Sequence, residues 1–264
     1  MKHVGERDAS ARRSAKRGPT NLESRHMELD NRVAVVSGAS AGIGEAIARE
    51  LSAAGVKLVL TARRTDRLEA LARELPGPAE VLAGDIAAPD MAERLLRLAE
   101  ERHGRADILI NNAALLVMGT VDTIDVEAAA QMVRVNFEAV VRTCYVFGRA
   151  FKAQQSGAII NFTSIGAFGT APMNAVYGGL KAGLERFTAG LRVELGPFGV
   201  RVGSLAPGST RTEMLDHLRR TRGAPVDAPA LAPADIAATV RFMLERPDHV
   251  NIAAIRVYSS DSPS

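Results

Sequence analysis

The chain has 264 residues, of which 47% are hydrophobic and 24% charged, and this composition suits one large globular α/β domain. No apolar run approaches the roughly 18 residues of a membrane span, and no secretory hydrophobic segment opens the sequence. The single cysteine excludes an internal disulfide and fits a reducing, cytoplasmic compartment. The scattered histidines lack partners at ligand spacing, so no metal site is expected.

The formal net charge of +3 arises near the N-terminus. Residues 1–26 carry seven Lys or Arg and three Asp or Glu side chains, whereas the remaining residues carry 26 basic and 27 acidic ones. A basic segment can bind nucleic acid or anionic lipid, but this one also contains acids and few apolar residues. We therefore expect residues 1–26 to be a disordered extension without nucleic-acid or membrane partners, ahead of one domain over residues 27–264. Met27 is an alternative start of the chain.

An apolar run over residues 32–37 leads into a glycine turn and then into helical spacing over residues 45–51. The turn reads G-x-x-x-G-x-G rather than the G-x-G-x-x-G of the standard dinucleotide fingerprint. Glycines there let the backbone approach a pyrophosphate, and the helix N-terminus offers unpaired N–H groups. A tight connection is the alternative, but the flanking strand and helix favour a phosphate-binding turn. Its predicted cofactor contacts are Gly38, Ser40, Gly42, Ile43 and Gly44.

The second strand, residues 56–61, is followed by Arg63 and Arg64, with no acid before Asp66. A site for NAD(H) places an acid about 20 residues past the glycines, on the ribose 2′-hydroxyl, whereas an arginine accommodates a 2′-phosphate. A solvated basic turn is the other interpretation. Two guanidinium groups without a carboxylate favour NADP(H) over NAD(H), with the Ser40 hydroxyl as a further phosphate donor.

The middle of the chain alternates strands with helices. Helices are expected over residues 66–75 and 91–103, and strands over residues 80–84 and 107–110. This alternation predicts right-handed crossovers and a single-domain Rossmann fold, with a doubly wound parallel sheet of about seven strands and helices on both faces. Ligands bind beyond the carboxyl ends of such strands. Polar residues stand at these ends, at Ser40, Arg63, Asp85 and Asn112.

The second half of the chain continues this alternation. Residues 126–149 are long enough for one extended helix with Asn136 in its middle, where an asparagine usually faces solvent or bonds to backbone. A strand over residues 158–163 ends at Ser164. The remaining expected elements are a helix over 175–195, a strand over 200–205, a polar lid-like segment over 213–232, a helix over 233–245 and a strand over 252–257.

Tyr177 and Lys181 lie four residues apart near the start of one of these helices, so they share a helix face. An ammonium group held there favours the phenolate and lowers the tyrosine pKa toward neutrality, which suits a proton donor to a carbonyl. From the spacing alone, an exposed helical pair without a role is the better interpretation.

Together these motifs resemble the classical short-chain dehydrogenase/reductase family across residues 28–258. The residues that carry the resemblance are Ser37-Gly38-x-x-x-Gly42-Ile43-Gly44, Asn111-Asn112-Ala113, Asn136, Ser164, Tyr177-x-x-x-Lys181 and Pro207-Gly208. Two positions depart from the family pattern. Ser37 stands where Thr is usual and keeps the hydroxyl, and Ala114 replaces a usual Gly, which adds a methyl group beside the cofactor channel.

The resemblance implies an NADP(H)-dependent oxidoreductase that transfers a hydride between the nicotinamide and a small carbonyl or secondary-alcohol substrate. Its catalytic set would be Asn136, Ser164, Tyr177 and Lys181. Tyr177 would exchange the hydroxyl proton, Lys181 would lower its pKa and bind the nicotinamide ribose, and Ser164 would hydrogen-bond the carbonyl oxygen. Asn136 would hold a water that links Lys181 to solvent. A non-catalytic NADP(H)-binding regulatory protein is the alternative, but no member of the catalytic set is lost.

The family pattern also implies the remaining contacts and the assembly. Asp85 and Ile86 would frame the adenine. The segment from Pro207 to Thr212 would cover the nicotinamide, and a homodimer or homotetramer would form through the helices at 126–149 and 175–195. Further cofactor contacts are expected at Asn112, Pro207, Gly208, Thr210 and Thr212.

The C-terminal region, from Asp235-Ile236-Ala237 through His249-Val250-Asn251-Ile252 with Pro247 before it, resembles a subgroup that contains NADP-dependent serine or 3-hydroxy-acid dehydrogenases and clavulanate-type dehydrogenases. The segment from Tyr177 to Ala182 fits the same subgroup. The substrate pocket would be lined by residues 114–118, 165–176 and 208–222. Phe168, Met173 and Met214 among them suggest that part of the pocket is apolar. Arg219, Arg220 and Arg222 would either receive an anionic substrate or form a solvated helix face. Cys144 is expected in the core or an interface rather than as a nucleophile.

Overall fold

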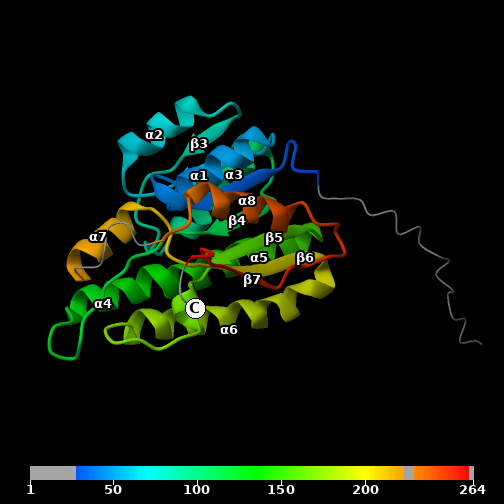
Figure 1. Cartoon of the computed structure of the whole chain (residues 1–264). Coiled ribbons are helices and arrows are strands. Elements are labelled where there is room, and N and C mark those ends of the chain that lie inside the picture. The colour runs from blue at the N-terminus through cyan, green and yellow to red at the C-terminus, as the bar shows by residue number, and fades with distance from the viewer. Residues whose placement is uncertain (1–27, 223–228, 262–264) are drawn as a thin grey trace, which may run out of the picture.

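The computed structural model describes residues 28–222 and 229–261. They form three layers, a parallel sheet of seven strands between two layers of helices (Figure 1). The sheet order is β3-β2-β1-β4-β5-β6-β7, with the chain reversing direction across the sheet between β1 and β4. The predicted Rossmann fold is therefore confirmed. The strands are β1 (Val33–Ser37), β2 (Lys57–Thr61), β3 (Ala79–Val81), β4 (Ile108–Asn111), β5 (Gly157–Phe162), β6 (Val200–Pro207) and β7 (Ala254–Val257).

The predicted helices are present within a few residues of their expected bounds, and residues 91–103 and 175–195 match them fully. The described helical segments are α1 (Gly42–Ala53), α2 (Thr65–Glu74), α3 (Met91–His103), α4 (Val126–Val133), η1 (Arg134–Glu138), α5 (Ala139–Gln154), η2 (Ile165–Ala167), α6 (Ala175–Leu195), η3 (Gly196–Phe198), α7 (Glu213–Arg222) and α8 (Pro233–Leu244).

Each face of the sheet buries its own apolar core, because side chains alternate along a strand. On β1, Ala34 and Val36 point to one face and Val33 and Val35 to the other. Helices α1, α2 and α8 cover the first face, and α3, α5 and α6 cover the second. Burial on both faces explains why the central strands are continuous apolar runs rather than alternating ones. Both layers hold the strand ends, and hence the site, in fixed positions.

The expected single helix over residues 126–149 needs a correction. A π-helical turn, Arg134–Glu138, separates α4 from α5 and places Asn136 in a fully buried position. The Asn136 side-chain amide donates to Leu115 O and accepts from Leu115 N, both at 2.8 Å. Such a turn adds one residue to a helical repeat and often marks a functional site. Asn136 therefore bonds to backbone rather than facing solvent.

Residues 213–232 were expected to form a lid-like loop, but the segment begins with a helix, α7. Thr212 caps this helix, since its Oγ1 accepts from Leu215 N at 3.3 Å. Where this segment leaves and rejoins the rest of the fold, Arg211 N donates to Leu231 O at 2.9 Å and Leu231 N donates to Ser209 O at 2.8 Å. Two backbone bonds thus tie the ends of this segment together.

Some sequence-based expectations lie outside the described residues. These are the disordered character of residues 1–26, the alternative start at Met27, and residues 223–228 of the lid segment. Within the two described ranges, no helix has the length and apolar character needed to cross a membrane.

Candidate active site

A cavity of about 670 Å³ lies beyond the carboxyl ends of the strands. This volume is in the range of small-molecule and cofactor sites. Gly44 and Asn136 are the predicted site residues that do not line it. The predicted residues that do line it are Gly38, Ser40, Gly42, Ile43, Arg63, Arg64, Asp85, Ile86, Asn112, Ser164, Tyr177, Lys181, Pro207, Gly208, Thr210 and Thr212.

The glycine turn starts α1 immediately after β1. Gly38 has a left-handed φ of 70°, and a Cβ there would lie 2.8 Å from Ala113 Cα. A Cβ on Gly44 would overlap the Gly38 carbonyl oxygen, so Gly44 serves the turn without facing the cavity. Ala41, the N-cap residue of α1, provides no side-chain cap. The N–H groups of the first turn of α1 therefore remain available to an anion in the cavity.

Ser37 and Asn112 join the ends of β1 and β4. Ser37 Oγ donates to Ile110 O at 3.2 Å and accepts from the backbone N–H groups of Asn112 and Ala113, both at 3.1 Å. The Asn112 amide donates to Ser37 O at 3.0 Å. The hydroxyl that Ser37 shares with threonine thus fastens the two strands around which the cavity is built.

The two predicted arginines at the end of β2 differ in their partners. Arg63 is exposed and makes no ion pair with a described residue. Arg64 Nε donates to Ser40 Oγ at 3.2 Å, and Arg64 Nη1 donates to Glu213 Oε2 at 2.7 Å. Arg67 Nη1, in the first turn of α2, donates to the other Glu213 oxygen. Ser40 and Arg64 come together as the sequence predicts, whereas the Glu213 contact was not predicted.

Asp85 and Ile86 line the cavity directly beyond β3. Asp85 is exposed, and its Oδ1 accepts from Ala87 N at 2.9 Å. This short side-chain turn fixes the backbone on which Ile86 stands.

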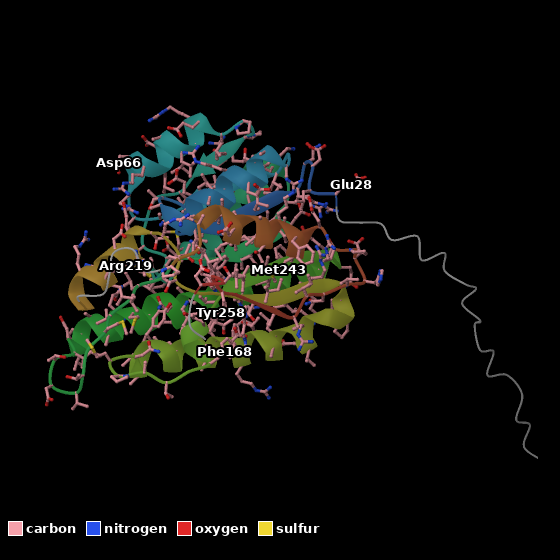
Figure 2. The ribbon with its side chains drawn as sticks, viewed as in Figure 1. Glu28, Asp66, Phe168, Arg219, Met243 and Tyr258 are labelled. Atoms are coloured by element: carbon pink, nitrogen blue, oxygen red, sulfur yellow. The ribbon has the colours of Figure 1, made fainter. Side chains whose placement is uncertain are left out.

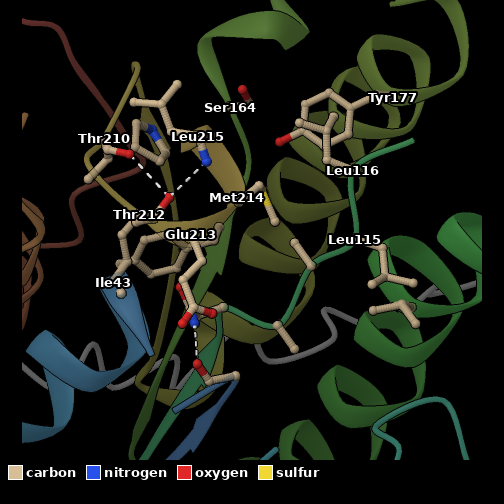
Figure 3. A pocket seen from close by; sticks show the side chains of 18 of the residues that line it. Ile43, Leu115, Leu116, Ser164, Tyr177, Thr210, Thr212, Glu213, Met214 and Leu215 are labelled. Atoms are coloured by element: carbon tan, nitrogen blue, oxygen red, sulfur yellow. Dashed lines mark hydrogen bonds between the residues drawn. The ribbon is translucent and has the colours of Figure 1, made fainter. Parts of the chain in front are cut away.

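Two side-chain hydroxyls, those of Ser164 and Tyr177, line another part of the cavity. Ser164 and Tyr177 point toward the same region (Figure 3). Burial raises the pKa of the Tyr177 phenol above its ordinary value of 10.0, and the Ser164 hydroxyl partly offsets this rise. Lys181 is only 2% exposed, and burial lowers its pKa to about 8. Its Nζ donates to Phe162 O at 2.7 Å and lies 5.8 Å from the centre of the Tyr177 ring.

In the chain without cofactor the pKa of Tyr177 is raised, so its lowering by Lys181 remains a prediction for the cofactor-bound site. Burial, which disfavours the phenolate, is the largest cause of the raised pKa of the phenol. The lysine is itself desolvated and directs one N–H donor to the end of β5. An ammonium has three donors, so two remain to bind groups that enter the cavity.

Asn136 does not line the cavity but bonds to Leu115, which does. Its side-chain amide makes one donor and one acceptor bond to the backbone of this cavity-lining residue. The predicted link from Lys181 through Asn136 to solvent remains a prediction, since the side chain is already engaged with backbone.

The cavity wall near Tyr177 is apolar, with Leu116 beside the ring and Met214 close by (Figure 3). Met214 lines the cavity as expected, but Met173 does not, and Phe168 instead stacks against Arg256 at 3.4 Å from the ring centre. Arg219 does not line the cavity either and lies on α7 at the edge of the molecule (Figure 2). Among the described residues, the basic side chains that line the cavity are Arg63, Arg64 and Lys181.

Comparison with known proteins decides the family. The sequence pattern described as short chain dehydrogenase matches residues 32–223. The chain belongs to this family. It is similar to an uncharacterized oxidoreductase of Staphylococcus aureus, with 34% identity over 87% of this chain and 97% of the relative. Membership makes the chain an oxidoreductase of the short-chain dehydrogenase/reductase type, as the motifs predicted.

Solved structures of this family share the fold and include complexes with NADP. A metagenomic short-chain oxidoreductase in complex with NADP has 32% identity and a TM-score of 0.75, covering 87% of this chain and 97% of that one. The closed form of a serine dehydrogenase complexed with NADP+ has 29% identity and a TM-score of 0.80, covering 85% and 94%. These neighbours support a nicotinamide cofactor.

Sequence reasoning missed the carboxylate of Glu185, which lies on α6, the helix that carries Tyr177 and Lys181. Glu185, one turn beyond Lys181, accepts from Thr163 Oγ1 on one oxygen and from Ser204 Oγ at 2.7 Å on the other. It thereby ties α6 to the residue after β5 and to the middle of β6. Its i+4 spacing from Lys181 was the available signal, but no local motif pairs it with either hydroxyl.

Cys144 is fully buried on α5, as expected for a core residue. Burial raises the pKa of its thiol to about 12, and Asn111 and Asn161 lie within weak hydrogen-bond distance of the sulfur. A protonated, inaccessible thiol is a poor nucleophile, so Cys144 belongs to the core.

Proposed function

We propose that this protein is an NADP(H)-dependent oxidoreductase that interconverts a carbonyl compound and the corresponding secondary alcohol through Ser164, Tyr177 and Lys181. The observation that carries the proposal is the arrangement of one cavity. The two hydroxyls and the lysine line one end, and the glycine turn with Arg63 and Arg64 lines the other. A cavity of about 670 Å³ lined by both groups suits a bound dinucleotide.

The hydrogen-bond donors that the site leaves available fit such a cofactor. The uncapped first turn of α1 offers N–H groups to a pyrophosphate, and the Lys181 ammonium has donors left for ribose hydroxyls. Ser40 and Arg64 offer a hydroxyl and a guanidinium to a 2′-phosphate, and Arg63 adds a second positive charge.

The bound nicotinamide would supply or accept the hydride at the carbonyl carbon. Tyr177 would donate its phenolic proton to the carbonyl oxygen in reduction and remove it in oxidation. The Ser164 hydroxyl would hydrogen-bond that oxygen as negative charge develops on it. Lys181 would favour the phenolate once its ammonium is held against the ribose. Asn136 would position Leu115 and hence the wall of the cavity.

We propose an apolar, uncharged substrate. Leu116, Met214 and the side chains around them surround the position of the reacting oxygen, and no described basic residue except Lys181 is near it. A 3-hydroxy acid or serine needs a cationic partner for its carboxylate. Serine or a 3-hydroxy acid, the substrates that the subgroup resemblance implies, is therefore the less favoured proposal.

A panel of ketones tests this proposal. We expect NADPH oxidation with hydrophobic ketones, and kcat/KM for them well above that for 3-oxo acids of equal size. Binding of NADPH without turnover of any carbonyl or alcohol would instead favour the non-catalytic alternative. Faster turnover of the acids would overturn the assignment of an uncharged substrate.

The cofactor preference has its own test. We expect Arg63→Ala combined with Arg64→Ala to weaken NADPH binding by about tenfold or more while NADH binding changes little, since only NADPH carries the 2′-phosphate. An unchanged preference in this variant would contradict the assignment of these arginines.

We also propose that residues 27–264 form one cytoplasmic domain that assembles as a homodimer or homotetramer. Exposed apolar side chains on the outer surfaces of α5 and α6 support this, since Tyr145 and Val193 are 41% and 70% exposed. Light scattering on the purified full-length chain would give the assembly, and a monomer would contradict it.

A further inference from the structure

A carboxylate lies where the proposed cofactor would place a phosphate. Glu213, the first residue of α7, contacts Arg64 through one oxygen at 2.7 Å and Arg67 through the other. All three side chains are between 41% and 57% exposed. Glu213 also lines the cavity, in the same region as Ile43 and Thr212 (Figure 3). The contact joins α7 to the turn after β2, across 149 positions of sequence.

The position of Arg64 makes this contact significant. Its Nε already faces Ser40 at the glycine turn, and its Nη1 faces Glu213. A carboxylate and a phosphate present similar oxygen pairs to a guanidinium group, so both compete for the same donors. The two arginines hold the pKa of Glu213 at about 2, so the carboxylate stays negative across the pH range of the cell.

We propose that Glu213 is an internal competitor for the 2′-phosphate at Arg64, and that Arg67 keeps the carboxylate when the phosphate displaces it. This inference rests on the proposed function. It makes Glu213 a specificity-determining residue that weakens binding of NADP(H) but not of NAD(H), which has no group to place on Arg64. It gives Arg67 the role of keeping α7 attached to α2 while the phosphate occupies Arg64.

The geometry assigns different roles to the two arginines. Arg64 precedes α2 as its N-cap residue and reaches both the cavity and Glu213, whereas Arg67 lies within the first turn of α2 and contacts Glu213 without lining the cavity. Transfer of the carboxylate from a shared contact to Arg67 alone needs only side-chain rotation. The cost of losing one exposed ion pair is small, so the effect on binding is a modest factor rather than a block.

Titration calorimetry with 2′,5′-ADP and 5′-AMP isolates this effect, because the two probes differ only by the 2′-phosphate. We expect Glu213→Gln to tighten 2′,5′-ADP binding about threefold at low ionic strength and to leave 5′-AMP unchanged. Asp216→Asn is the matched control, since it removes the same charge one turn along α7 from a residue that does not line the cavity. We expect it to change neither affinity.

A double substitution tests the role of Arg67. We expect Arg67→Ala to weaken 2′,5′-ADP binding and Glu213→Gln to cancel that loss in the double variant. If the loss persists in the double variant, Arg67 acts only as a nearby cation, and the transfer of Glu213 is overturned.

Failure of the inference is distinct from failure of the proposed cofactor preference. Unchanged or weaker 2′,5′-ADP binding by Glu213→Gln, or an equal change for both probes, overturns the competition. A wild-type chain that binds both probes equally contradicts the NADP(H) preference. The competition is then still supported if Glu213→Gln gains a preference for 2′,5′-ADP, and is overturned if it does not.

Discussion

Tyr177 shows how burial shifts the pKa of a single residue. Its helical spacing from Lys181 led us to expect a lowered pKa, but spacing does not report solvent access. The surrounding cavity walls desolvate both side chains, so the phenol pKa rises while the lysine pKa falls. Without cofactor, both residues are therefore biased toward their neutral forms.

The chain contains three tyrosines, which makes this shift measurable. We expect an ultraviolet difference titration of the cofactor-free protein to show one tyrosine that ionises above pH 10, and we expect that step to be missing in Tyr177→Phe. The physical reason is the loss of solvation of the phenolate. If the ionisation step that Tyr177→Phe removes lies near pH 7 instead, the account of this residue is contradicted.

Lys181 gives a prediction for stability with a definite sign. Its pKa is about 8 in the folded state against an ordinary value of 10.5, so between these values the unfolded state binds more protons and stability rises with pH. Below pH 8 the cost of the buried charge is fully present. We expect Lys181→Met to be more stable than wild type by about 1–3 kcal/mol at pH 7, with the difference shrinking toward pH 10.

Denaturant unfolding at both pH values measures this difference, with Lys152→Met on the exposed surface of α5 as the control. A Lys181→Met protein that is less stable than wild type at pH 7 would show that the bond to Phe162 O outweighs the desolvation of the ammonium.

At the scale of the elements, strand ends were easier to predict than helix interiors. The ends of β1, β2, β4 and β5 carry Ser40, Arg64, Asn112 and Ser164, and parallel pairing brings such ends to one edge. The π-helical turn at Asn136 depends on a bond to Leu115, 21 positions away, and α7 depends on the Thr212 cap and the tie at Leu231. Periodicity reports neither kind of contact.

The connection between α6 and the sheet can be tested at Glu185. We expect Glu185→Ala to lower the free energy of unfolding by about 2–4 kcal/mol, because two hydroxyls lose a charged acceptor. We also expect kcat to fall more than NADPH affinity, since Glu185 holds the helix that carries Tyr177 and Lys181. Glu194→Ala, at an exposed position near the end of the same helix, serves as the control. Equal stability of both variants would contradict this role.

At the scale of the whole molecule, the fold and most of the cavity could be predicted because the predicted strands, helices and strand-end residues all indicated the same topology. Alternating strands and helices require a parallel sheet, and a parallel sheet collects its carboxyl ends. Contacts between distant side chains could not be predicted in this way. Glu213 reaches Arg64 only because α7 folds back over the turn after β2, and no spacing in the sequence encodes that approach.

Steady-state NADPH oxidation by wild type and Tyr177→Phe, with a hydrophobic ketone and with NADPH binding measured alongside, tests the central claim most directly. The account predicts that kcat falls at least about 100-fold while NADPH still binds, because the substitution removes the proton donor and keeps the ring. Turnover by Tyr177→Phe at the wild-type rate would contradict the assignment of Tyr177 as the catalytic acid.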